Sequence, residues 1–311
     1  MHTYSIASVI SFCTHDFRFL RQCLKGVVPF SEQILVTVCD HFFNGEQENY
    51  ALLEEAYRAF PEVTFLEFRF HTTERYGDFC TLEPRLGEER HHWHNVGRFT
   101  SYYFLQEKIS HLFFFDVDEL AEGERLREWL LQDGVMDHNA LRFAAHVYFR
   151  EAHHRKETFG NGPLLVRRVA VQPEMLLDPD ERSGLFWAVS GEKREDVQDQ
   201  EGFPFVHHYS FVRPKEEMLC KVQRWGHFWE RDWEGLIEEE FRHEFNGVDF
   251  VLGHRHTPAL PFFDPLAEKI PDVREEISLE EHRKRCLSLS NVISVTPRDL
   301  FRKDIALRLS S

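Results

Sequence analysis

The stretch HLFFFDVDEL, residues 111–120, places an apolar run directly before three carboxylates. The run ends in three consecutive phenylalanines, and the carboxylates belong to Asp116, Asp118 and Glu119. A short apolar run without polar alternation is typical of a strand that is buried on both faces, as in a parallel sheet. Ligands of open α/β sheets bind beyond the carboxyl ends of the strands. The stretch therefore predicts a buried strand whose acidic tip faces a ligand-binding crevice.

The residues before this stretch alternate between strand-like and helix-like patterns. Apolar, β-branched segments at 4–13, 33–40 and 63–70 predict buried strands, and apolar residues recur at helical spacing over 48–60 and 95–109. This alternation is typical of a doubly wound α/β fold. We therefore predict a mixed, mostly parallel sheet with helices on both faces.

The second half of the chain predicts more strands and then a change of character. Strand-like segments occupy 162–171 and 203–212, and the sequence turns Pro-rich near residue 255 before it becomes charged and helical. We predict one domain over 1–254 and a helical C-terminal extension over 255–311 that packs on it. The polar, irregular segment 71–93 is rich in His and Arg and predicts a mobile lid or acceptor loop.

Composition excludes some classes of protein. The 311 residues carry a formal charge of −16, which disfavours sequence-independent binding to a phosphate backbone, so we expect no nucleic-acid partner. The six cysteines are scattered without a CxxC pair, which indicates free thiols in a reducing compartment. No apolar run is long enough to span a membrane, and the N-terminus lacks the features of a secretory signal. We expect a cytoplasmic protein and leave peripheral membrane association open.

The two aspartates of the stretch are candidate metal ligands. Asp116 and Asp118 are two residues apart, so on a strand both side chains face the same side. Paired hard oxygen donors at a strand end suit Mg²⁺ or Mn²⁺ that is shared with substrate phosphates. The alternative is a plain acidic turn in which Asp118 caps the following helix.

The sequence D-V-D-E-L at 116–120 resembles a known motif. It is similar to the D-x-D-E-[FL] motif of metal-dependent glycosyltransferases with the GT-A fold, in their family 2-like and family 92-like members. The resemblance spans roughly residues 4–230. It implies a GT-A-like fold in which Asp118 holds the divalent metal. It also implies that Asp116 reaches the nucleotide ribose, or the metal through water.

The resemblance extends to the ends of the first two strands. A short polar turn with Thr14 and Asp16 follows the first strand, and Asp40 with a Gly-containing loop follows the second. In the resembled group these positions cradle the base and ribose of the sugar nucleotide. For Asp40 a simple turn residue is the alternative. We also name Arg98 as a phosphate contact, with a solvated helix charge as the alternative.

A late histidine pair provides one more candidate ligand. In FPFVHHYSF, residues 203–211, strand alternation places His207 on the core face and His208 on the opposite face. A His-Tyr pair at this point is part of the resemblance. A neutral imidazole can complete a metal site, so we predict His208 as a third ligand beside Asp116 and Asp118.

The proton acceptor of a transfer reaction is the least defined residue. The candidate carboxylates, which lie between the two motifs, are Asp178, Asp180, Glu181, Glu192 and Asp196. The segment LLDPDERSGLF indicates a loop that enters a helix, so Asp180 or Glu181 would lie at a positive helix N-terminus. We select these two as catalytic candidates, and a helix cap is the alternative for each.

These observations favour a metal-dependent glycosyltransferase that uses Mn²⁺ or Mg²⁺. It would move a sugar from a nucleoside-diphosphate sugar, with UDP favoured and GDP possible, to a glycan or lipid-linked acceptor. A metal-dependent nucleotidyltransferase or phosphoesterase is one alternative, although the first loop lacks the glycines typical of sugar nucleotidyltransferases. A non-catalytic nucleotide- or glycan-binding protein is the other. We expect Asp118, as a strand-tip acid, to support ligand binding more than stability.

Overall fold

The structure is a computed structural model of the 311-residue chain. It describes residues 4–68, 89–132, 134–227, 230–273, 275–296, 299–300 and 302–303. The predicted lid at 71–93 lies outside the described residues as far as residue 88.

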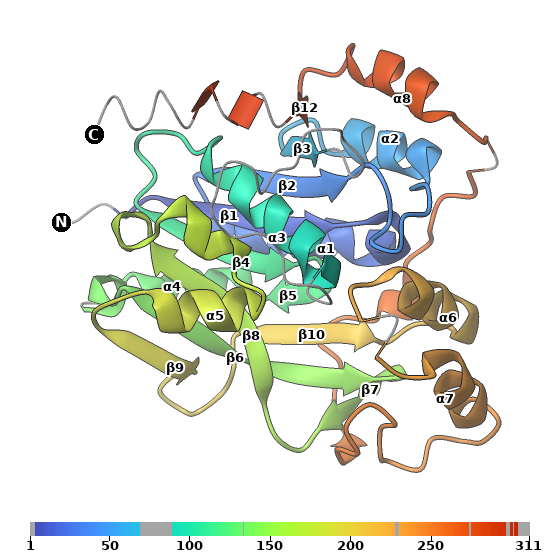
Figure 1. The fold of residues 1–311 in the computed structure, drawn as a ribbon. Coiled ribbons are helices and arrows are strands. Elements are labelled where there is room, and N and C mark those ends of the chain that lie inside the picture. Colours follow the sequence, from blue (N-terminus) through green and yellow to red (C-terminus); the bar gives the residue numbers. More distant parts are fainter. Residues whose placement is uncertain are drawn as a thin grey trace.

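A large mixed sheet runs through the centre of the molecule (Figure 1). Its parallel part has the order β4-β1-β2-β3-β12. The strands are β1 (Ile6–Phe12), β2 (Gln33–Cys39), β3 (Thr64–Phe68), β4 (His111–Asp116) and β12 (Val292–Val295). The predicted α/β class with a mixed, mostly parallel sheet is confirmed.

The sheet continues beyond β4 through antiparallel pairs. β8 pairs with β4, β6 with β8, β7 with β6 and β11 with β7, while β9 and β10 run parallel to β6 and β5 pairs with β10. These strands are β5 (Glu119–Ala121), β6 (Ala140–Phe149), β7 (Glu151–Lys156), β8 (Gly160–Arg167), β9 (Lys193–Val197), β10 (Val206–Phe211) and β11 (His256–Pro258).

The phenylalanines of β4 show why this strand lies at the centre of the fold. Phe113 and Phe115 belong to one apolar cluster, whereas Leu112 and Phe114 belong to another on the opposite face. Alternate side chains of a strand point to opposite faces, so an unbroken apolar run can serve two cores at once. The strand is therefore covered on both sides and ends at Asp116.

Helices cover both faces of the parallel part. One cluster includes residues of α1 (Phe17–Val27), α2 (Tyr50–Ala59) and α4 (Gly123–Leu130). The other includes residues of α3 (Glu89–Tyr102) and α5 (Glu181–Ala188). This arrangement agrees with the doubly wound pattern that the sequence predicts.

Two predicted elements differ from the structure. The helix expected over 95–109 is α3, Glu89–Tyr102, which ends seven residues earlier than predicted. The backbone that follows it is held by the side chain of Gln33 in place of helical hydrogen bonds. That side chain donates to the carbonyl of Phe104 at 2.9 Å and accepts from the backbone N–H of Gln106 at 3.0 Å. The strand expected over 162–171 ends at Arg167, and a short 3₁₀ turn follows it.

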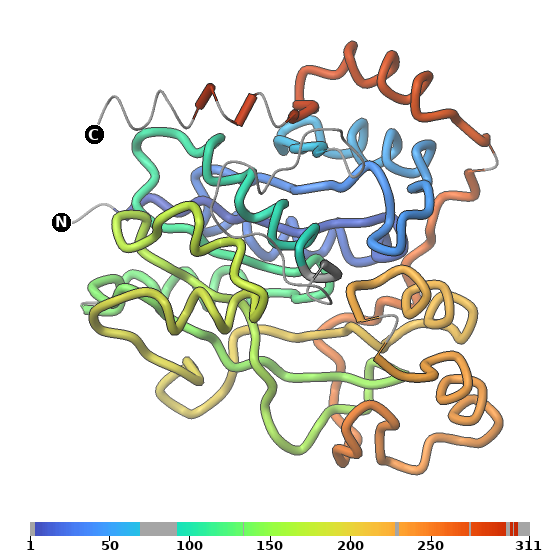
Figure 2. Tube along the Cα trace, viewed as in Figure 1, coloured from blue at the N-terminus to red at the C-terminus, as the bar shows by residue number. Residues whose placement is uncertain are grey.

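The chain after β10 returns to the parallel part of the sheet. The helices α6 (Lys215–Arg224) and α7 (Trp233–Glu240) pack together, and β11 follows them. The chain then runs to the far end of the sheet, where α8 (Leu279–Cys286) lies beside α2 and β12 pairs with β3 (Figure 2).

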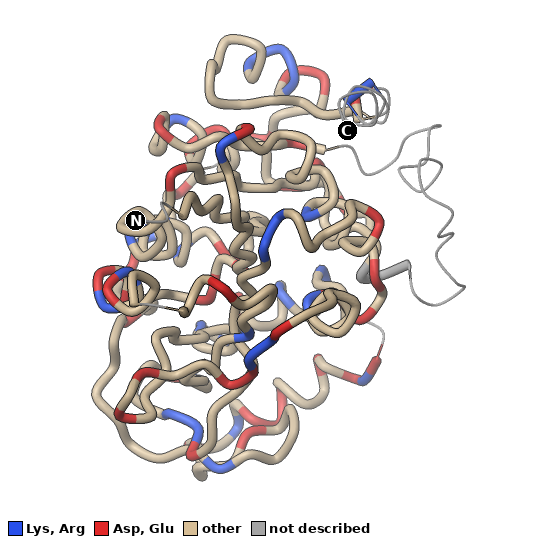
Figure 3. Tube along the Cα trace, turned by 90° about the vertical axis from the view of Figure 1, so that its left-hand side faces the viewer, with Lys and Arg blue, Asp and Glu red and all other residues tan. Residues whose placement is uncertain are grey.

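Charged residues are interspersed along the fold, with Lys and Arg among Asp and Glu (Figure 3). Among the described residues, no helix is both long enough and apolar enough to cross a lipid bilayer.

Candidate active site

A cavity of about 440 Å³ opens at the carboxyl ends of β1, β2 and β4. The strand β1 lies between β2 and β4, so the chain winds away from β1 in both directions. A crevice forms at such a switch point because the connections after neighbouring strands leave on opposite faces of the sheet. The strand ends contribute Ser11, Phe12, Cys13, Thr37, Cys39 and Asp116 to the cavity wall.

Asp118 lies at one side of this cavity in a cluster of buried charges. The Nζ atom of Lys221, from α6, lies 2.8 Å from Asp118 Oδ2 and 3.4 Å from Asp16 Oδ1. Arg213 donates to Asp16 Oδ1 at 2.7 Å. All four side chains are buried. Buried ions of opposite sign offset each other's desolvation, so this cluster is held together as a unit.

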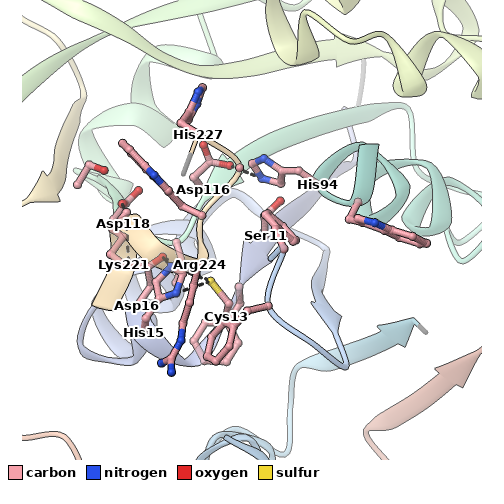
Figure 4. A pocket seen from close by; sticks show the side chains of 18 of the residues that line it. Ser11, Cys13, His15, Asp16, His94, Asp116, Asp118, Lys221, Arg224 and His227 are labelled. Carbon is pink, nitrogen blue, oxygen red and sulfur yellow. Dashed lines mark hydrogen bonds and ion pairs between the residues drawn. The ribbon is translucent and has the colours of Figure 1, made fainter. Parts of the chain in front are cut away.

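Asp116 belongs to a separate cluster beside the first (Figure 4). Its carboxylate lies 3.0 Å from Arg182 Nη2, 3.1 Å from His94 Nε2 and 3.4 Å from Arg98 Nη2. Arg98 also contacts Glu181 Oε2 at 3.3 Å. Three basic side chains from two helices thus fix the orientation of one carboxylate.

The surrounding cations keep both aspartates ionised. Burial raises the pKa of the Asp118 carboxyl, but Lys221 and His208 together outweigh burial and hold the pKa well below its usual range. Burial likewise opposes ionisation of Asp116, but Arg182 and then His94 hold its pKa far below the usual range. Both residues therefore present negative charge to the cavity across the neutral pH range.

His208 and Asp118 are placed as partners for a shared cation. His208 Nε2 lies 3.4 Å from Asp118 Oδ1, and both residues line the cavity. Burial lowers the pKa of His208, but the bond to Asp118 raises it above the ordinary value. His207 instead lies in the core, where Nδ1 contacts Tyr148 Oη at 2.9 Å and Nε2 contacts Glu122 at 3.1 Å.

The three predicted metal ligands do not converge on one point. In the described part of the chain, the sets of three donor atoms that lie within 4.8 Å of one another do not include Asp116, Asp118 and His208 together. Asp118 and His208 fit a divalent cation as a pair because an oxygen and a nitrogen donor face each other at the cavity wall. Asp116 is directed toward its basic neighbours instead.

The structure separates the other predicted donor-site residues. Asp16 lines the cavity beside Cys13 and His15. Thr14 is not among the lining residues, because its backbone N–H and its hydroxyl both bond to the buried carboxylate of Glu48. Burial raises the pKa of Glu48 to about 7. Thr14 therefore stabilises the turn after β1 through its bonds to Glu48 and does not line the cavity.

Asp40 and Arg98 also lie behind the cavity wall. Asp40 is buried, and its Oδ2 accepts from Arg283 of α8 at 2.8 Å, so it connects the end of β2 to the C-terminal extension. Arg98 is 2% exposed and contacts the cavity-lining residues Asp116, Glu181 and His94.

The two catalytic candidates occupy different positions. Asp180 is the N-cap residue of α5 and does not line the cavity, whereas the next residue, Glu181, does. Glu181 has a φ angle of 53°, a left-handed conformation that is costly for a residue with a side chain. Such outliers persist where the surroundings enforce them, and they are frequent at functional sites.

Several residues of the site are absent from the sequence prediction. They are the basic partners of the aspartates: Lys221, Arg182, His94 and Arg213. One signal was present for Lys221. It belongs to the apolar side of α6 with Met218 and Val222, and a lysine at such a position must find a carboxylate.

Much of the remaining cavity wall is apolar. It is formed by aromatic and aliphatic side chains from the loop after β2, from α3, and from the region around α6 and α7. These residues include Phe43, Trp93, Phe211, Trp225, Trp233, Val251 and Leu252. The cavity therefore has both charged and aromatic side chains in its wall, a combination that suits a ligand with a phosphorylated part and a sugar or apolar part.

No known family model and no curated protein matches this chain. Solved structures with similarity include 4-diphosphocytidyl-2C-methyl-D-erythritol synthase from Anaerococcus prevotii, with 10% identity, a TM-score of 0.39, and coverage of 73% of this chain and 99% of that one. S. aureus TarS shows 10% identity and a TM-score of 0.39, with 71% of this chain and 65% of that one covered. The glycosyltransferase GlyE of Streptococcus pneumoniae shows 13% identity and a TM-score of 0.34, with 77% and 64% covered. At these scores the likenesses carry no weight for activity.

Proposed function

We propose that this protein is a GT-A-type glycosyltransferase that transfers a sugar from a nucleoside-diphosphate sugar to a glycan or lipid-linked acceptor. The observation that carries the proposal is the cavity at the β1 switch point, where Asp118, His208 and Lys221 meet beside Asp116. Its volume of about 440 Å³ lies in the range of small-molecule sites. Carboxylates that lie beside a lysine and a histidine suit a ligand that brings both phosphate and a metal ion.

The nucleotide of the donor is assigned to the ends of β1 and β2. Cys13, Thr37 and Cys39 line this part of the cavity, and Asp16 is a further lining residue. Lys221 and Arg224 line the neighbouring wall and supply positive charge for a diphosphate. UDP is the favoured nucleotide, and GDP is the second choice to test.

Asp118 and His208 would hold Mn²⁺ or Mg²⁺, which would stabilise the charge on the leaving diphosphate. In the structure, the ammonium of Lys221 offsets the negative charge of Asp118. When phosphate enters the cavity, the same ammonium can bond to phosphate oxygens in place of the carboxylate. The free and bound states would then both keep their buried charges paired.

Glu181 is the proposed proton acceptor for the acceptor hydroxyl. It lines the cavity and belongs to the cluster of Asp116, with His94 Nδ1 at 3.5 Å and Arg98 Nη2 at 3.3 Å from its carboxylate. A carboxylate in this position can take a proton while the two basic groups hold its orientation. The aromatic wall with Trp225 and Trp233 would receive the acceptor by stacking.

Turnover with candidate donors tests the proposal. Wild-type protein is incubated with UDP- and GDP-sugars, with Mn²⁺, with Mg²⁺ or with chelator, and nucleoside diphosphate release is followed. We expect metal-dependent release from one donor class and a drop of about 100-fold or more in Asp118→Asn, since a metal ligand is lost. The exposed Glu201 provides a matched control, and Glu201→Gln should leave release unchanged.

Two outcomes would overturn the proposal. Release of pyrophosphate from nucleoside triphosphates, with no release of diphosphate from any sugar nucleotide, would indicate a nucleotidyltransferase. Tight binding of sugar nucleotides without turnover in the presence of varied glycan acceptors would indicate a binding protein.

A further inference from the structure

A second cluster of potential metal donors lies outside the cavity lining, where the C-terminal extension meets the sheet. The donor atoms of Glu67, His282 and Cys286 lie within 4.8 Å of one another, and all three side chains are buried. Glu67 belongs to β3, whereas His282 and Cys286 are four residues apart on α8 and therefore share one face of that helix. The cluster bridges two parts of the chain that are more than 200 residues apart in sequence.

We propose that Glu67, His282 and Cys286 form a structural zinc site that fastens α8 to the edge of the sheet. An imidazole, a carboxylate and a thiolate are the donor types that zinc selects in proteins. His282 Nε2 lies 2.8 Å from Glu67 Oε2 and 3.5 Å from Cys286 Sγ. Tetrahedral zinc would separate the nitrogen from the sulfur by about 3.6 Å and from the oxygen by about 3.3 Å. Glu67 and His282 therefore need to separate by only about half an ångström, whereas Cys286 Sγ, which also lies 3.7 Å from His282 Nδ1, has to turn toward Nε2 to reach the ion.

An independent observation concerns the other nitrogen of the same ring. Glu54 is 1% exposed, and its Oε1 accepts no hydrogen bond among the described residues, yet it lies 3.5 Å from His282 Nδ1. A histidine that ligates metal through one nitrogen usually donates its other N–H to a carboxylate. Glu54 occupies that position, so the carboxylate, the imidazole and the metal donors follow one another in the order that such sites require.

The charges around the ring also favour a cation. Carboxylates face both nitrogens of His282, and a neutral imidazole has one N–H and can donate to only one of them. The buried Cys286 thiol lies beside these carboxylates, and zinc binding would replace its proton. Tyr57 supports the site by donating to Glu67 Oε2 at 2.9 Å.

Metal analysis of the whole protein is the test. Wild-type protein purified after growth with zinc should hold one zinc ion per chain by mass spectrometry of metals, and should keep it through dialysis. Asp118→Asn should hold the same amount, which separates this site from the cavity. Cys286→Ser should lose the ion, whereas Cys23→Ser should not, although Cys23 is also a buried free thiol. Glu54→Gln should keep the stoichiometry and weaken zinc affinity by about 10- to 100-fold.

A second measurement needs no variant that fails to fold. Cobalt-substituted wild-type protein should show a thiolate-to-cobalt charge-transfer band, and the same band in Cys13→Ser, whose thiol belongs to the other cysteine-containing donor group, would assign it to Cys286. Wild-type protein that retains no zinc after reconstitution, or a cobalt complex without a thiolate band, would overturn the proposal.

Discussion

Two regions of this protein place carboxylates against an imidazole, and they differ in where their positive charge comes from. At the cavity, Asp118 meets His208 and also the built-in cation Lys221. At the cluster around His282, Glu54 and Glu67 lie near the two different ring nitrogens. Arg58 and Arg285 contact Glu54 through its Oε2 atom, which is not the oxygen nearest His282. The side chains of the first region line the cavity, whereas those of the second are buried away from solvent.

The difference indicates two kinds of site. The ammonium of Lys221 offsets the charge of Asp118, and in the proposed function it would bond instead to a phosphorylated ligand that enters with its metal. A sealed cluster without such a partner is suited to an ion that is bound once, during folding. Loss of the histidine should therefore mainly reduce activity in the first region and mainly reduce stability in the second.

The largest effect is expected from breaking the buried cluster at the cavity. Asp118→Ala leaves Lys221 buried without its nearest carboxylate and should lower the free energy of unfolding by about 3–5 kcal/mol. The double variant Asp118→Leu with Lys221→Met should recover most of this loss, because no unpaired charge is left. Denaturant unfolding of both variants checks the pair. A double variant that is no more stable than Asp118→Ala would show that the two charges are not coupled.

The two histidines provide the next comparison. His282→Gln should lower the free energy of unfolding by about 3 kcal/mol, because it leaves two buried carboxylates without their partner. His208→Gln should cost less than about 1 kcal/mol, since its side chain is partly exposed and reaches Asp118 only at 3.4 Å. Nucleoside diphosphate release should show the reverse order. Equal losses of stability would remove the contrast between the open and the sealed region.

The carboxyl group of Glu48 is buried and accepts hydrogen bonds from neutral donors, so it allows a test of how stability depends on pH. Its pKa is about 7 in the folded chain, against 4.5 for an unperturbed glutamate, because burial raises it. The folded state therefore holds more protons between these pH values, and stability should fall as pH rises through this window, by at most about 3 kcal/mol. Glu48→Gln should remove that decline when melting is compared at pH 5 and pH 8. A decline that persists unchanged in the variant would exclude Glu48 as its source.

The smallest effect is expected at Asp180. It is the N-cap of α5, but its side chain makes no capping hydrogen bond, so Asp180→Ala should change the unfolding free energy by less than about 0.5 kcal/mol and should leave turnover unchanged. Glu181→Gln should instead reduce turnover by about 100-fold or more with little change in donor affinity. The reverse result would assign the proton acceptor to Asp180.

The fold was accessible from the sequence where one short pattern decides the structure. An apolar run such as residues 112–115 can only be satisfied by two cores, so the strand and its acidic tip follow directly from the residues. Strand alternation likewise separates His207 from His208. The exit of α3 depends on a side chain from β2, Gln33, and local periodicity holds no signal for it.

The site was less accessible because its charges are paired across the chain. Lys221 lies 103 residues after Asp118, and Arg182 lies 66 residues after Asp116. The sequence predicts that Asp118 supports a ligand more than the fold, but its burial beside Lys221 indicates that it does both. The pairing of Asp40 with Arg283 has the same origin, since only the folded chain brings α8 to the end of β2.

A calorimetric titration of UDP and GDP into the protein, with and without Mn²⁺, tests whether the cavity binds metal and nucleotide together. We predict that Mn²⁺ strengthens binding of one nucleoside diphosphate by about 10-fold or more, and that this gain disappears in both Asp118→Asn and His208→Gln. Glu201→Gln should bind as the wild type does. Binding that is independent of metal, or a gain that survives in both cavity variants, would contradict the assignment of Asp118 and His208 as the residues that bring metal and nucleotide together.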